Sequence, residues 1–152
     1  MRVLFPIILL MTACQSGKVQ PASIEAGDIC AFCKMAISQA GYAGQFIDEE
    51  GSTFKFDDIG CMVRFARENN RRSSVAAFFV MDYNDRRWLD ASQATYVKSA
   101  KTASPMASGL TAFRESSRAE EYSAKNDGRI LHFEDLWQSD VAEPLHLPTR
   151  QW

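Results

Sequence analysis

The sequence lacks the motifs of several common enzyme classes. It contains no glycine-rich phosphate loop, no serine nucleophile elbow and no pair of acidic residues with a recognisable catalytic spacing. Histidine is scarce, with only His132 and His146 in the chain. These gaps argue against phosphate-handling and hydrolytic chemistry, and we expect the protein not to be an enzyme.

A strong excess of one charge is lacking as well. The chain has 17 lysines and arginines against 19 acidic residues, a formal charge of −2, and loss of Arg2 with an N-terminal segment would make it 16 against 19. A nucleic-acid-binding protein would show a basic excess. The isolated pairs Arg71-Arg72 and Arg86-Arg87 are typical of a solvated surface. We therefore expect no nucleic-acid partner.

No apolar run reaches the roughly 20 residues that a membrane-spanning helix needs. The run Val3 to Met11 follows Arg2 and ends at the small residues Thr12 and Ala13, which is the pattern of a secretory signal peptide. The next residue, Cys14, indicates lipoprotein processing, with cleavage before it, a diacylglyceryl group on its sulfur and an acylated amino terminus. Ordinary cleavage that leaves Cys14 free is the alternative.

This processing predicts a protein held on the periplasmic side of a bacterial membrane by several acyl chains. Gln15, rather than aspartate, follows the anchor and favours the outer membrane. The region after the anchor is rich in Ser, Pro, Ala and Gly, whereas the C-terminal end has prolines and no periodicity. The expected organisation is a signal peptide (1–13), a flexible membrane tether (14–26), one compact domain (27–141) and a loose C-terminal tail (142–152).

Within the domain, the first half predicts a hairpin followed by a helix. Apolar and polar residues alternate over Tyr42–Asp48 and Thr53–Phe56, on either side of a turn. Asp57 or Asp58 can cap a helix that runs from Ile59 to about Glu68 with one apolar face.

The second half repeats the combination of strands and a capped helix, so the fold class expected is α+β, a small single domain of antiparallel hairpins with two helices in ββα-type units. The two halves look related, although their sequence identity is too low to establish a duplication. The expected elements are a buried strand Val75–Tyr83, its partner Trp88–Ala91, a strand Leu110–Phe113, a helix opened by the capping-box spacing of Ser117 and Glu120 and ending near Lys125, a strand Arg129–His132 and a helical turn Phe133–Gln138.

The segment Cys30-Ala-Phe-Cys33-Lys-Met35 places two thiols and one thioether within six residues. Soft sulfur ligands of this mixture select Cu(I) over harder metals. The two cysteines alone favour a structural disulfide, a redox dithiol or half of a zinc site, taken together, over copper. Met35 favours copper, because oxygen-preferring ions would not use a thioether.

Several further segments accompany the cysteine motif. They are Phe56-Asp57-Asp58-Ile59-Gly60-Cys61, Phe79–Tyr83, Trp88–Ala91, Ser104-Pro105-Met106-Ala107-Ser108-Gly109, and the final helix with Gly128 and Phe133. In this order they resemble the NosL-type copper chaperones, periplasmic lipoproteins associated with assembly of the copper centres of nitrous oxide reductase. The resemblance spans most of the chain after the signal peptide. It departs at Ala107, where the family pattern has glycine, and this affects only the local loop.

The resemblance implies a Cu(I) carrier that gives its ion to apo nitrous oxide reductase, in a small fold of repeated hairpin and helix units. It points to Cys30, Cys33 and Met35 as ligands, with Met106 as a distant thioether able to fold over the metal. His132, at the end of a predicted strand, could add an imidazole. Ligation by few sulfur atoms would let an acceptor add a donor before a ligand leaves.

Other sulfur and histidine residues are less clearly assigned. Met62 and Met81 fall on apolar faces and are expected in the core. Cys61 lies on the buried side of the predicted helix, where inert burial is the default, but it could approach the cysteine motif in the fold. His146 lies in the expected tail, and its role stays open.

Two other functions use the same cysteine pair. Thiol–disulfide oxidoreductases usually carry it at the start of a helix in a parallel βαβ unit, whereas here it precedes a hairpin. A structural zinc domain needs two more ligands, which Cys61 and His132 could supply, but no second closely spaced pair exists. Neither function requires Met35 or Met106. A copper site would require Cys30 and Cys33 to be reduced.

Overall fold

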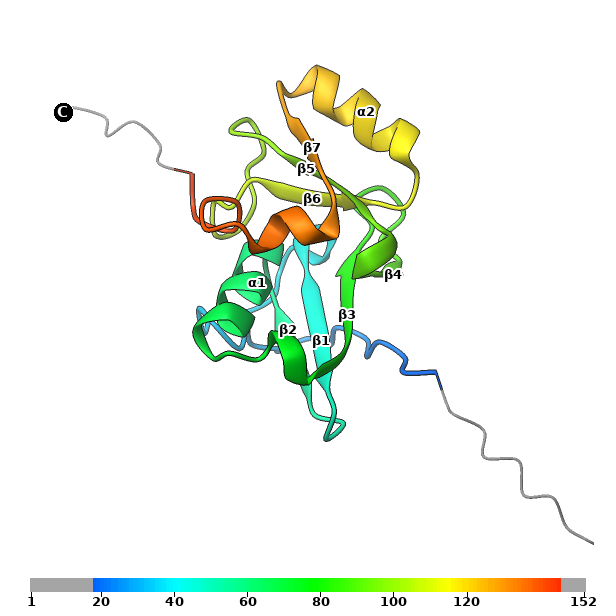
Figure 1. The fold of residues 1–152 in the computed structure, drawn as a ribbon. Helices are drawn as coiled ribbons and strands as arrows, with labels where there is room; N and C mark the ends of the chain where they lie inside the picture. The colour runs from blue at the N-terminus through cyan, green and yellow to red at the C-terminus, as the bar shows by residue number, and fades with distance from the viewer. Residues whose placement is uncertain (1–17, 146–152) are drawn as a thin grey trace, which may run out of the picture.

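The computed structural model describes residues 18–145 (Figure 1). The expected signal peptide, the anchor Cys14 and His146 therefore lie outside the described residues. Among residues 18–145, none of the helices has the length and apolarity needed to span a bilayer. The described part is an α+β domain with two antiparallel sheets and two α-helices, which confirms the fold class expected from the sequence.

The first sheet has the strand order β2-β1-β3-β4, with every neighbouring pair antiparallel. Its elements are β1 (Gly44–Asp48), β2 (Thr53–Phe56), α1 (Ile59–Glu68), β3 (Val75–Met81) and β4 (Trp88–Asp90). The predicted hairpin and helix are both confirmed. Asp58 is the N-cap of α1, because its Oδ1 accepts a hydrogen bond from the backbone N–H of Gly60 at 2.7 Å.

The second sheet has the order β6-β5-β7 and is also antiparallel. Its elements are β5 (Thr95–Lys98), β6 (Leu110–Phe113), α2 (Ser116–Lys125) and β7 (Arg129–Leu131). The sequence did not predict β5. The expected capping box is wrong, because the N-cap of α2 is Glu115, which makes no side-chain cap, and Ser117 already lies inside the helix. Four short 3₁₀ helices complete the fold: η1 (Ala40–Tyr42), η2 (Arg72–Ser74), η3 (Ala91–Gln93) and η4 (Phe133–Trp137).

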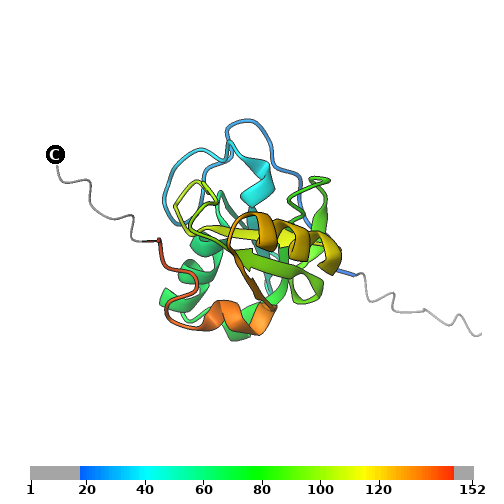
Figure 2. The ribbon, with the colours of Figure 1, turned by 90° about the horizontal axis from the view of Figure 1, so that it is seen from above.

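The two sheets share one topology. We call β1-β2-α1-β3 the first unit and β5-β6-α2-β7 the second unit; in each, the first strand is central and the helix joins the other two strands. In Figure 1 the second unit lies above the first, with α2 on its outer side, and in the view from above α2 crosses in front of the second sheet (Figure 2). Asp82 bridges to Ala112 of β6 and joins the units.

The core lies between the first sheet, α1 and the second sheet. The ring of Phe46 in β1 is fully buried and contacts four other phenylalanine rings, at centroid distances from 4.8 to 6.1 Å: Phe54, Phe56, Phe65 and Phe78. Full burial of one such side chain contributes about 1.5–3 kcal/mol. Met62 and Met81 are buried, as expected. Cys30 and Cys61 belong to the same buried region, which places two thiols in the interior.

Both ends of the described chain are packed on the domain. The side chain of the fully buried Gln45 accepts from the N–H of Ala22 at 2.9 Å and donates to its carbonyl at 2.8 Å. Ala142 is buried, and the N–H of Leu145 donates to the carbonyl of Ala107 at 2.7 Å. These contacts tie residues 22, 142 and 145 to the domain.

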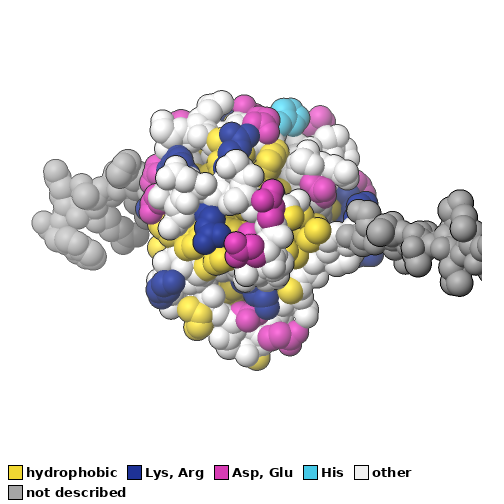
Figure 3. All heavy atoms as spheres, turned by 60° about the horizontal axis from the view of Figure 1, so that its bottom comes forward, with side chains coloured by type: hydrophobic (Ala, Val, Ile, Leu, Met, Phe, Trp, Pro, Cys, Tyr) yellow, Lys and Arg dark blue, Asp and Glu magenta, His cyan; other side chains and the backbone are white. Residues whose placement is uncertain are grey.

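The face seen in Figure 3 carries basic and acidic side chains interspersed with apolar ones, without an area of a single sign.

Candidate metal site

The cysteine motif, Cys30 to Met35, forms a tight loop that precedes β1 in the sequence. The N–H of Cys30 donates to the carbonyl of Met35 at 2.8 Å, which closes the loop on itself. Lys34 takes a left-handed backbone conformation, with φ of 65°, so that the chain can turn back. The N–H of Ala31 donates to the carbonyl of Lys55 at 2.8 Å and fixes the loop to β2. The two thiols are thus placed by backbone hydrogen bonds.

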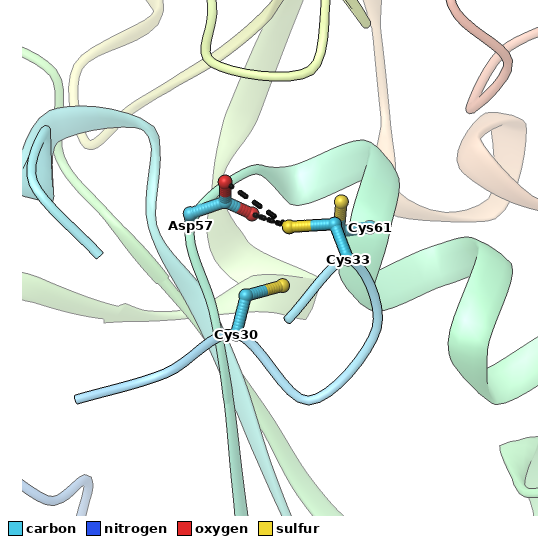
Figure 4. Close-up of side chains that lie close together, drawn as sticks. All are labelled: Cys30, Cys33, Asp57 and Cys61. Carbon is cyan, nitrogen blue, oxygen red and sulfur yellow. Dashed lines mark hydrogen bonds between the residues drawn. The ribbon is translucent and has the colours of Figure 1, made fainter. Parts of the chain in front are cut away.

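Four side chains converge beside this loop (Figure 4). One ligand atom from each of Cys30, Cys33, Asp57 and Cys61 can be chosen so that all four lie within 4.8 Å of one another. The first two come from the cysteine loop, Asp57 from the turn between β2 and α1, and Cys61 from the first turn of α1. In the part of the chain that the structure describes, no other group of three or more His, Cys, Asp or Glu side chains converges in this way.

Burial differs among the thiols. Cys30 and Cys61 are fully buried, whereas Cys33 is partly exposed, so the group opens to solvent on the side of Cys33. All three cysteines are free thiols. The thiol of Cys33 donates to Asp57, with sulfur-to-oxygen distances of 3.4 and 3.5 Å.

Hydrogen bonding and burial shift the pKa values of the group apart. Interaction with the Cys61 thiol lowers the pKa of Cys30 to about 4, while the nearby Cys30 and burial raise the pKa of Cys61. Burial raises the pKa of Cys33 to about 11, and burial together with the nearby Cys30 raises that of Asp57 to about 6. These opposite shifts favour ionisation of Cys30 over ionisation of Cys33 or Cys61.

Met106 approaches the same region from the second half of the chain. Its loop, Ser104–Gly109, connects β5 to β6, and its backbone N–H donates to Oδ2 of Asp58 at 3.1 Å. This contact holds the backbone of Met106 next to the start of α1, the helix whose first turn carries Cys61. Met35 lies at the end of the cysteine loop with 55% of its surface exposed.

His132 lies in a different setting. It is exposed and forms the N-cap of η4: its backbone N–H donates to the Asp135 carboxylate at 2.8 Å, and its carbonyl accepts from the backbone N–H of Asp135 at 3.0 Å. It is not part of the group of thiols. Sequence reasoning missed Asp57, although a signal was present: of two consecutive aspartates before a helix, only one can be the N-cap.

Three sulfur atoms and one carboxylate suit a soft cation. Thiolates are ligands of Cu(I), zinc and iron–sulfur clusters, and the full set of three sulfurs and one oxygen matches tetrahedral zinc as well. A preformed thiolate attracts the cation, and binding then displaces protons from the other thiols.

Comparison with known proteins gives three findings. The family model described as NosL matches residues 21–141. The chain is 26% identical over 134 residues to the "Copper-binding lipoprotein NosL" of Stutzerimonas stutzeri, covering 82% of this chain and 70% of that protein. The crystal structure of the "copper chaperone NosL from Shewanella denitrificans" has the same fold, with a TM-score of 0.72 at 19% identity, over 79% of this chain and 97% of that one. Neither relative is named as an enzyme.

Proposed function

The chain belongs to the NosL family, and on that premise we propose that it is a copper chaperone that carries Cu(I). The observation that carries this proposal is the convergence of three free thiols and Asp57 within 4.8 Å. Both relatives named above are described as copper proteins, which supports the same cargo.

The proposed ligand set begins with the Cys30 thiolate and the neighbouring Cys33. Cys61 joins them as a third sulfur, because its sulfur atom lies within 4.8 Å of theirs. Met35 and Met106 are retained as thioether donors. His132, the remaining residue predicted from the sequence, would have to leave its position at the start of η4 to reach copper, and it has the least geometric support.

Transfer of the ion follows from the gradient of exposure across the site. The exposed Met35 and the partly exposed Cys33 are the groups that an acceptor meets first, whereas Cys30 and Cys61 lie behind them. A donor of the acceptor can add on the open side before the inner thiolate releases the ion, so copper does not pass through water. The proposed acceptor is apo nitrous oxide reductase, reached from a lipid anchor at Cys14 on the periplasmic side of the outer membrane.

The test is a Cu(I) competition titration on the reduced chain from Gln15 onward. We expect tight one-to-one binding, weakened about 10-fold or more by Cys30→Ser and Cys33→Ser, and less by Met35→Leu and Met106→Leu. The matched control is Met81→Leu, because Met81 is buried in β3 and a swap between these two side chains is well tolerated. Weak Cu(I) binding by the unmodified protein, or a preference for zinc, would overturn the proposal.

Structural zinc binding is the second candidate, because three cysteines and one aspartate provide a complete tetrahedral set. It predicts that a chelator unfolds the purified protein, which a copper carrier folded without metal would resist. Thiol–disulfide exchange has less support, since that reaction needs an accessible thiolate. Here the thiolate, Cys30, is fully buried, and burial raises the pKa of the accessible Cys33 to about 11.

A further inference from the structure

We propose that Asp58 is a positioning residue that sets where the Met106 thioether is offered to the metal, a role that rests on the proposed copper function. Asp58 is fully buried and its two oxygens have different partners. Oδ1 accepts from the N–H of Gly60 and caps α1, while Oδ2 accepts from the N–H of Met106 at 3.1 Å. One carboxylate thus joins the helix that carries Cys61 to the loop that carries Met106.

The loop Ser104–Gly109 can approach α1 this closely because residue 60 is glycine. A Cβ at Gly60 would lie 2.6 Å from the Cβ of Ser108 and 2.8 Å from the carbonyl oxygen of Ala142, closer than packed atoms come. On its other side the loop is held by the N–H of Leu145, which donates to Ala107. Asp58 is the contact that reaches Met106 itself.

The neighbouring aspartate supports a division of roles. Asp58 has extended backbone angles, φ −144° and ψ 138°, and successive side chains of an extended chain point to opposite sides. Asp57 accordingly accepts from the thiol of Cys33, whereas Asp58 accepts from the loop of Met106. These two consecutive residues therefore contact both sides of the site: Asp57 contacts the thiol of Cys33, and Asp58 contacts the loop that carries the Met106 thioether.

The substitution Asp58→Asn isolates this contact. Asparagine is as good an N-cap as aspartate, so its amide oxygen can still accept from Gly60. Its NH₂ group cannot accept from the N–H of Met106. The matched control is Glu115→Gln, since Glu115 is the N-cap of α2 at the corresponding position and makes no side-chain cap.

The experiment is a double-mutant cycle of Cu(I) affinity on the reduced chain from Gln15 onward, with the unmodified protein, Asp58→Asn, Met106→Leu and the double variant. We expect Asp58→Asn to weaken binding about 10-fold, and to have little further effect in the Met106→Leu background. Glu115→Gln should leave the Cu(I) affinity unchanged, both in the unmodified protein and in the Met106→Leu background. Amide hydrogen exchange at Met106, measured without copper, should become faster in Asp58→Asn.

The outcomes separate the two proposals. If the unmodified protein binds Cu(I) and the two losses simply add, the positioning role is overturned while the copper function stands. Failure of the unmodified protein to bind Cu(I) overturns both. Should Asp58→Asn unfold, Asp58→Ser replaces it, because serine also caps helices but is too short to hold Met106 as well.

Discussion

The two units of the fold have the same backbone plan and different chemistry. Their helices begin after Asp58 and Glu115, which stand 57 positions apart, and each has ten residues. The same spacing relates the residues that follow the helix C-caps, since Asn70 and Asp127 both have positive φ, 51° and 48°. Related signals at the same spacing indicate one ββαβ design used twice.

The difference lies at the junction between the second strand and the helix. Where the first unit has Asp57 and Cys61, the second has the exposed residues Arg114 and Arg118. The first unit covers its junction with the cysteine loop and the Met106 loop, so that the first turn of α1 is buried. In α2 only Ala119 is buried. The unit is therefore a scaffold, and the candidate site arises only where two loops enclose the start of the helix.

The largest expected difference between the units is in pH dependence. The pKa of Cys30 falls on folding, from 9.0 to about 4, so its contribution to stability is complete above about pH 9 and declines as the pH falls toward 4. Asp57, with a pKa raised to about 6, acts in the opposite direction but has finished titrating above that pH. Between about pH 7 and 8, where Asp57 has lost its proton and the thiols of Cys33 and Cys61 keep theirs in both states, the free energy of unfolding of the reduced, metal-free protein should rise with pH, by at most about 1.4 kcal/mol per unit.

Chemical denaturation at several pH values measures this slope. Cys30→Ser should flatten it, because the group that loses a proton on folding is gone. A variant with an unchanged slope would show that the pH dependence does not come from Cys30.

A smaller effect is expected from the matched pair Cys61→Ala and Arg118→Ala. The sulfur of Cys61 lies within 4.8 Å of those of Cys30 and Cys33, among the candidate ligands, so its loss should weaken Cu(I) binding about 10- to 100-fold. Arg118 stands at the corresponding position of α2, exposed and paired with Glu121, and its loss should leave affinity unchanged. Competition titration gives both values, with denaturation of the metal-free proteins as a control for folding. Equal affinities in the two variants would mean that the junction of the first unit is not the metal site.

The same comparison explains what the sequence could predict of the fold. The first hairpin, α1 and its cap were readable because their signals are local: alternation, a turn and an aspartate before an apolar helix face. Strand β5 was missed because four residues, Thr95–Lys98, carry no strong pattern of their own and form a strand by pairing with β6 and β7. The start of α2 was misplaced because Ser117 had cap spacing, while the helix begins before it.

For the site, the local part was readable and the distant part was not. Cys30, Cys33 and Met35 lie in one short segment, so their spacing could suggest a candidate site from the sequence alone. Asp57 and Cys61 join the thiols only because Lys55 fixes the cysteine loop to β2, a contact between residues far apart in the sequence. His132 was proposed from its place after a strand, where local pattern could not show that it caps η4.

The smallest expected effect concerns backbone strain in the Met106 loop. The helix ends of both units adopt positive φ at Asn70 and Asp127, side chains that tolerate this conformation, but the loop does so at Ala107, with φ of 56°. A left-handed backbone conformation costs a residue such as alanine roughly 1–2 kcal/mol. Replacing alanine by glycine removes this cost, but it lowers the free energy of unfolding by roughly 0.5–1 kcal/mol, because glycine has a larger conformational entropy in the unfolded state. Ala107→Gly should therefore stabilise the metal-free protein by about 0.5–1 kcal/mol. Thermal denaturation should show a smaller gain for Asn70→Gly, and an equal or larger gain there would mean that the strain is no greater in the site loop than at an ordinary helix end.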